Sequence, residues 1–166
     1  ADYDLGDPDS SGYYSVKNTA GIDGFHSDKT VYYKPVNEKS KTVLDISQNG
    51  SSVTYKWQVE VKQTNGSFRG KTISDVMNAA SNDGKSIKSV LDPDSIIMYV
   101  QRNGKGSYET LNSSNYTVVP NADNTSFEIK FNDSEEFDNI NLVQIQYSST
   151  VDVTGLDAGT IINVNN

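Results

Sequence analysis

The sequence contains no cysteine, which excludes disulfide bonds, zinc–thiolate sites and a thiol nucleophile. Hydrophobic residues make up 34% of its 166 residues, and no run approaches the roughly 18 apolar residues that a membrane-spanning helix needs. The single histidine, His26, stands in a polar, turn-like stretch, and no motif of a serine hydrolase, a zinc protease or a phosphate-binding loop is present. These absences predict a protein without enzymatic turnover, cofactor or bound metal.

Positive charge is also scarce. The chain has 14 lysines and arginines against 22 aspartates and glutamates, which gives a formal net charge of −8. Binding to a phosphate backbone or to an anionic membrane surface requires clustered basic residues. We therefore expect neither nucleic acid nor a membrane as a partner, and the acidic surface mainly provides solubility.

Turn-forming residues are abundant, and tyrosine, valine and isoleucine carry much of the apolar content, as is typical of β-proteins. The clearest strand covers residues 53–62, where apolar and polar side chains alternate strictly. Its apolar face consists of Val53, Tyr55, Trp57, Val59 and Val61. A turn at Asn49-Gly50 joins it to a preceding strand expected at 41–46.

Further strands are expected along most of the chain, with a short helix or a long loop over the polar residues 78–92. The expected strands are 13–20, 30–36 (interrupted by Pro35), 72–77, 95–101, 116–119, 127–131, 143–153 and 160–164. Seven or more strands separated by turn signals predict a β-sandwich.

An ordered series of segments runs through residues 37–166: Lys41-Thr42-Val43, VTYKWQVEV (53–61), Ile73-Ser74-Asp75, SIIMYVQRNG (95–104), SSNYTVV (113–119), SFEIKF (126–131), IQYSSTVDV (145–153) and GTIIN (159–163). In this order and spacing, the segments resemble the isopeptide-forming immunoglobulin-like domains of Gram-positive pilins and collagen-binding-type adhesins. The resemblance implies an all-β, immunoglobulin-like sandwich of two antiparallel sheets with Greek-key connections. It also implies an extracellular place at the cell wall.

The same resemblance sets the expected domain boundaries and partners. Residues 37–166 would form the sandwich, and residues 1–36 would be a linker or the last strand of a preceding module. We expect the chain to be a segment of a longer protein, with any secretion signal or wall anchor outside it. Its expected partners are neighbouring tandem domains and a host extracellular-matrix protein.

An amide bond between Lys41 and Asn163, with Asn166 as the alternative, is the chemistry that the resemblance implies; Asp75 would be the acid that promotes it. Burial would favour the neutral, nucleophilic amine of Lys41 and the protonated form of Asp75. Folding would then hold amine and carboxamide together and replace a bimolecular encounter by an intramolecular one. Such a bond would supply the covalent staple that a chain without cysteine lacks.

Two alternatives stay open at the level of sequence. Lys41 and Asp75 could be ordinary surface charges and Asn163 a turn residue, and burial decides this because an exposed lysine stays protonated. Alternatively, Trp57 and the ten tyrosines could form the sugar-stacking platform of a carbohydrate-binding module. The phase of Trp57 with its valine neighbours instead predicts a core position.

Overall fold

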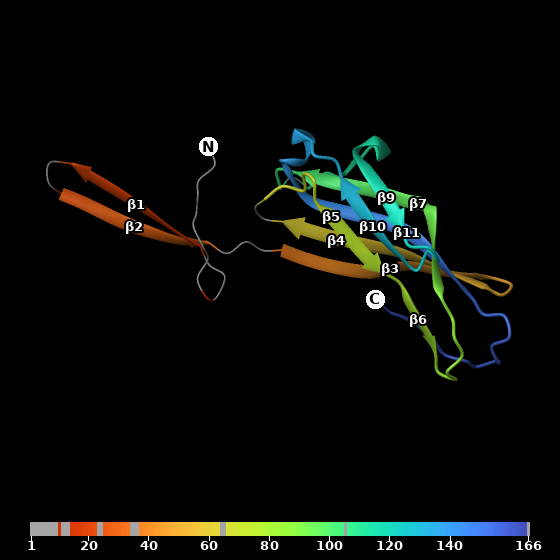
Figure 1. The fold of residues 1–166 in the computed structure, drawn as a ribbon. Coiled ribbons are helices and arrows are strands. Elements are labelled where there is room, and N and C mark those ends of the chain that lie inside the picture. The colour runs from red at the N-terminus through yellow and green to blue at the C-terminus, as the bar shows by residue number, and fades with distance from the viewer. Residues whose placement is uncertain are drawn as a thin grey trace. The chain divides into compact units, whose positions relative to one another are not determined.

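The computed structural model describes residues 10, 14–22, 25–33, 37–63, 66–104 and 106–165. The chain divides into two compact units, residues 1–37 and residues 38–166. In the first unit, β1 (Tyr14–Ile22) and β2 (Phe25–Tyr33) pair antiparallel (Figure 1). His26 lies within β2, so the prediction of a turn around it is wrong. The assignment of residues 1–36 to a linker or a preceding module stays a prediction.

In the described part of the second unit, a small antiparallel sheet overlies a face of a larger one (Figure 1). The large sheet has the order β3 (Asn37–Asn49), β4 (Ser52–Gln63), β11 (Ile140–Asp152), β7 (Ser89–Arg102) and β8 (Glu109–Thr110). The small sheet has the order β5 (Thr72–Val76), β10 (Ser126–Phe131) and β9 (Tyr116–Pro120).

A third pairing joins β6 (Asn78–Ser81) to β12 (Ile162–Asn165). Strand β6 follows β5 after one residue, and β7 begins at Ser89, so the loop predicted for 78–92 is confirmed over residues 82–88 and wrong at its two ends. Pairing with a distant segment makes a strand of β6, and local composition does not reveal such a partner. The described helices are two single turns, η1 (Ser113–Asn115) and η2 (Glu135–Phe137).

The core lies between the two sheets and follows the predicted alternation. On the apolar face of β4, Trp57 is 4% exposed, and on the polar face Lys56 and Lys62 are exposed. Phe127, Ile129 and Phe131 of β10 and Val143, Ile145 and Tyr147 of β11 contribute their inward faces to the same cluster. The rings of Phe127 and Tyr147 pack edge to face across the two sheets, with their centroids 5.0 Å apart. Burial of these faces is the main source of the sandwich's stability.

The fold is an all-β, immunoglobulin-like sandwich of antiparallel sheets, which confirms the predicted fold class. The connection from β4 to β5 and the connection from β10 to β11 both cross between the sheets, and β11 inserts between β4 and β7. Over the described ranges, the structure contains no helix with the length and hydrophobicity of a membrane span.

Candidate functional site

Lys41 and Asp75 meet inside the sandwich, although 34 positions separate them in sequence. Lys41 lies on β3 and Asp75 on β5, and each strand stands at the end of the order of its sheet. The Lys41 Nζ atom donates to Asp75 Oδ2 at 2.8 Å and to Oδ1 at 3.0 Å. The two side chains are only 16% and 12% exposed, so the ion pair is largely removed from water.

Aromatic rings surround this ion pair. The Lys41 ammonium lies 4.8 Å from the centroid of a Trp57 ring and 5.3 Å from that of Tyr147. The Tyr147 hydroxyl donates a hydrogen bond to Asp75 Oδ2 at 2.5 Å. In the strand ladders Tyr147 stands opposite Trp57, and Asp75 stands opposite Phe127. Four strands, β3, β4, β11 and β5, therefore supply one layer of interacting side chains.

The electrostatics of the site favour a reactive amine. Burial lowers the pKa of Lys41 below its usual value, and the hydrogen bond and charge of Asp75 offset only part of this effect. Burial, together with the neighbouring Asp75, raises the pKa of Tyr147 far above the usual range. Tyr147 thus stays a hydrogen-bond donor while Lys41 is shifted towards its neutral, nucleophilic form.

The structure does not bring Asn163 to this ion pair. Asn163 stands opposite Ala80 in the β6–β12 ladder and its side chain is exposed. Its neighbours Ile162 and Val164 are half-buried, and Val164 packs against the core. Successive side chains of a strand point to opposite faces, so Asn163 faces away from the core. Asn166, the alternative, lies outside the described residues.

The sequence reading missed two parts of the site. Tyr147 was recognised only as a member of an alternating strand, yet a buried tyrosine usually needs a partner for its hydroxyl, and here that partner is Asp75. A buried serine pair was also missed. Trp57 Nε1 donates to Ser149 Oγ at 2.9 Å, and Ser149 Oγ lies 2.7 Å from Ser89 Oγ.

Replacing Ser149 with alanine is expected to lower the free energy of unfolding by about 1–3 kcal/mol, because the buried Trp57 N–H loses its acceptor. Both serines of the pair are 0% exposed, so water cannot readily take the place of the hydroxyl. Urea denaturation followed by circular dichroism measures the loss. Ser148→Ala is the matched control on the opposite face of β11. Equal midpoints for the two variants would contradict this role of Ser149.

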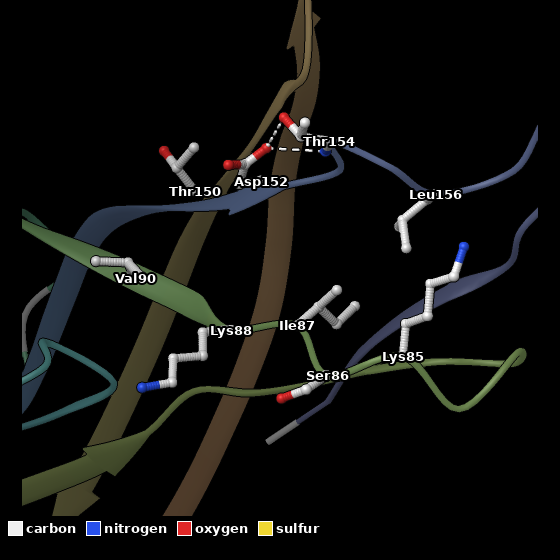
Figure 2. Close-up of a pocket in the computed structure, with 9 residues that line it drawn as sticks. All are labelled: Lys85, Ser86, Ile87, Lys88, Val90, Thr150, Asp152, Thr154 and Leu156. Atoms are coloured by element: carbon white, nitrogen blue, oxygen red, sulfur yellow. Dashed lines mark hydrogen bonds between the residues drawn. The ribbon is translucent and has the colours of Figure 1, made fainter.

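A surface cavity of about 470 Å³ lies where β7 begins and β11 ends (Figure 2). Its charged groups are already engaged with protein atoms. Lys85 donates to the Gly155 carbonyl, Lys88 pairs with Asp123 outside the cavity, and Asp152 accepts from Thr154. Over the described ranges, no group of three or more His, Asp or Glu side chains is placed to hold a metal ion. The aromatic layer around Lys41 and Asp75 is therefore the stronger candidate site.

No family model matches the chain, and no curated protein matches it either. Among solved structures, the collagen binding domain of the Erysipelothrix rhusiopathiae surface protein RspB is similar over 95% of this chain and 50% of its own, with 11% identity and a TM-score of 0.41. The full-length major pilin RrgB from Streptococcus pneumoniae is similar over 74% of this chain and 21% of its own, with 15% identity and a TM-score of 0.36. The chain thus spans half of the first structure and about a fifth of the second. At these scores neither similarity establishes a family or a function.

Proposed function

We propose that residues 37–166 form a structural or adhesive module of a cell-wall-anchored bacterial surface protein, stabilised by an internal Lys–Asn isopeptide bond. The observation that carries this proposal is the Lys41–Asp75 ion pair, which is largely buried between the sheets and ringed by Trp57 and Tyr147. A surface salt bridge contributes little to stability, and a buried lysine with a lowered pKa is a recognised sign of a reactive site.

The reaction transfers one proton within the ion pair and then exchanges one amide for another. The Lys41 ammonium gives a proton to the Asp75 carboxylate, and the free amine attacks the carboxamide carbon of an asparagine. The new bond joins Lys41 Nζ to that carbon, and the bond from the carbon to the carboxamide nitrogen breaks. The nitrogen leaves as ammonia, which takes up the proton held by Asp75 and departs as ammonium. Each chain reacts once, so the protein has no turnover on a substrate.

The faces of β12 count against Asn163 as the acyl partner, which leaves the alternative, Asn166. Ile162 and Val164 are half-buried, and Val164 packs against the core, so these two positions belong to the core face. Asn163 lies between these two positions, so its side chain points to the opposite face of the strand, and it is exposed. The paired register of Asn163 with Ala80 and Val164 with Ala79 directs β12 along β6 towards β5, which carries Asp75.

A cross-link between an early strand and the end of the sandwich suits a module that bears load between tandem neighbours. Tension on the two ends would then pass through a covalent bond instead of through strand hydrogen bonds. A host extracellular-matrix protein is the partner we propose for an adhesive role. The alternative, a carbohydrate-binding module, loses its most distinctive residue, because the Trp57 ring is buried in the core.

Peptide mapping of the digested protein tests the proposed bond. We expect a branched peptide that joins the Lys41 segment to Asn166, preserved in Asn163→Ala and lost in Asn166→Ala. A linear peptide with a free Lys41 in the wild-type digest would remove the isopeptide bond. A branch to Asn163 would keep the bond and overturn the assignment by strand face. Binding of the intact chain to immobilised matrix proteins then separates an adhesive module from a spacer.

A further inference from the structure

The hydroxyl of Tyr147 contacts the centre of the proposed chemistry without being one of the reacting groups. We infer that Tyr147 is a positioning residue for the cross-linking reaction: it holds one oxygen of Asp75 and leaves the other to take the proton of Lys41. This inference rests on the proposed isopeptide function and goes beyond it, because it assigns separate tasks to the two carboxylate oxygens.

The two oxygens of Asp75 differ in what they accept. Oδ2 accepts from the Tyr147 hydroxyl at 2.5 Å and from Lys41 at 2.8 Å. Oδ1 accepts from Lys41 at 3.0 Å, and no second donor reaches it from the described residues. A carboxylate oxygen has about two lone-pair sites, so Oδ2 is saturated while Oδ1 keeps one site open. The transferred proton therefore goes to Oδ1.

The position of Tyr147 is itself fixed from several sides. The residue is 1% exposed and sits on β11 opposite Trp57 of β4. Its ring packs nearly perpendicular to that of Phe127, with an interplanar angle of 77°. Such packing leaves the hydroxyl little freedom, so the hydrogen bond to Asp75 is in place before the reaction begins. Preorganised contacts of this kind avoid reorganisation at the moment of reaction.

Proton accounting gives the hydroxyl a definite role. Lys41 loses one proton to Oδ1, and Tyr147 keeps its own, because its O–H only donates to Oδ2. The neutral acid at Oδ1 then donates to the carboxamide oxygen of the asparagine while the amine attacks. Without Tyr147, both oxygens would have open sites, and the carboxyl group could rotate away from this arrangement.

Two titratable groups contact Asp75 among the described residues, Lys41 from β3 and Tyr147 from β11. Phe127 of β10 stands opposite Asp75 and carries no charge. Trp57 of β4, whose ring lies beside the Lys41 ammonium, carries none either. Removing the Tyr147 hydroxyl should therefore slow cross-linking and leave Lys41 as the remaining donor to Asp75 among the described residues.

The test uses Tyr147→Phe, which keeps the ring and removes only the hydroxyl. The full chain is made by cell-free translation, and intact mass follows the loss of ammonia with time. We expect cross-linking to slow by about 10- to 100-fold, the range that loss of a positioned contact produces. Tyr55→Phe is the matched control, because Tyr55 stacks on Trp57 without contacting Asp75; it should behave as the wild type.

A second variant separates positioning from simple destabilisation. Phe127→Leu loosens the packing of the Tyr147 ring but keeps its hydroxyl, so we expect it to cross-link closer to the wild-type rate than Tyr147→Phe does, with urea denaturation giving the stability lost in each variant. A wild-type rate in Tyr147→Phe, or an equal slowing in Phe127→Leu, would overturn the inference while the isopeptide bond stands. A wild-type chain that never loses ammonia would overturn the inference and the proposed function together.

Discussion

Replacing Lys41 with methionine is expected to lower the free energy of unfolding by about 5 kcal/mol, the chain-entropy value for a cross-link that closes a loop of more than 100 residues. The loop between Lys41 and Asn166 spans about 125 residues. Methionine keeps an unbranched apolar stem beside Trp57, so the substitution removes the amine with little change in volume. Guanidinium denaturation of the wild type and the variant measures the difference.

Double substitution distinguishes a cross-link from an ion pair. If the bond forms, Lys41→Met, Asp75→Asn and the double variant all lose it, and all three should be less stable than the wild type by about 5 kcal/mol or more. If only an ion pair were present, the double variant, which leaves neither charge without its partner, should approach the stability of the wild type. Lys39→Met, at an exposed position of the same strand, is the control and should match the wild type.

Replacing Trp57 with alanine is expected to lower the free energy of unfolding by about 3–5 kcal/mol, as for other large-to-small changes in a packed core. Trp57 is 4% exposed, stacks on Tyr55 at 5.8 Å, and bonds through its indole N–H to Ser149. The wild-type protein should show a blue-shifted tryptophan emission that quenchers reach poorly. Urea denaturation with Tyr108→Ala as the exposed control measures the loss.

The result that would contradict this account of Trp57 is specific. A Trp57→Ala variant that keeps wild-type stability but loses binding on a glycan array would indicate that Trp57 lies at the surface and not in the core. It would also revive the carbohydrate-binding alternative.

Strand alternation made most of the sandwich predictable. The apolar phase of residues 53–61 placed Trp57 and Val61 in the core, and the structure confirms both. Alternation works here because each of these strands has one buried and one wet face. The Asn49-Gly50 turn between β3 and β4 was predictable for a similar reason, since Gly50 has a positive φ of 59° that suits glycine.

The parts that could not be predicted depend on partners distant in sequence. Strand β6 is polar and short, and its pairing with β12 gives no local signal. The face of Asn163 depends on that pairing, so sequence order alone could not show that it points outward. The contact of Tyr147 with Asp75 joins two sheets across 72 positions in sequence, and neither segment predicts this contact from its own residues.

The central claim is that folding of this chain creates a covalent bond at Lys41, and the intact mass under denaturing conditions tests it most directly. The account predicts a wild-type mass lower than the sequence mass by one ammonia, and the full sequence mass in both Lys41→Ala and Asp75→Ala. Cyclisation at an Asn-Gly pair such as Asn49-Gly50 also releases ammonia, but that loss would persist in both variants. A wild-type mass equal to the sequence mass, or a loss that the variants retain, would contradict the account.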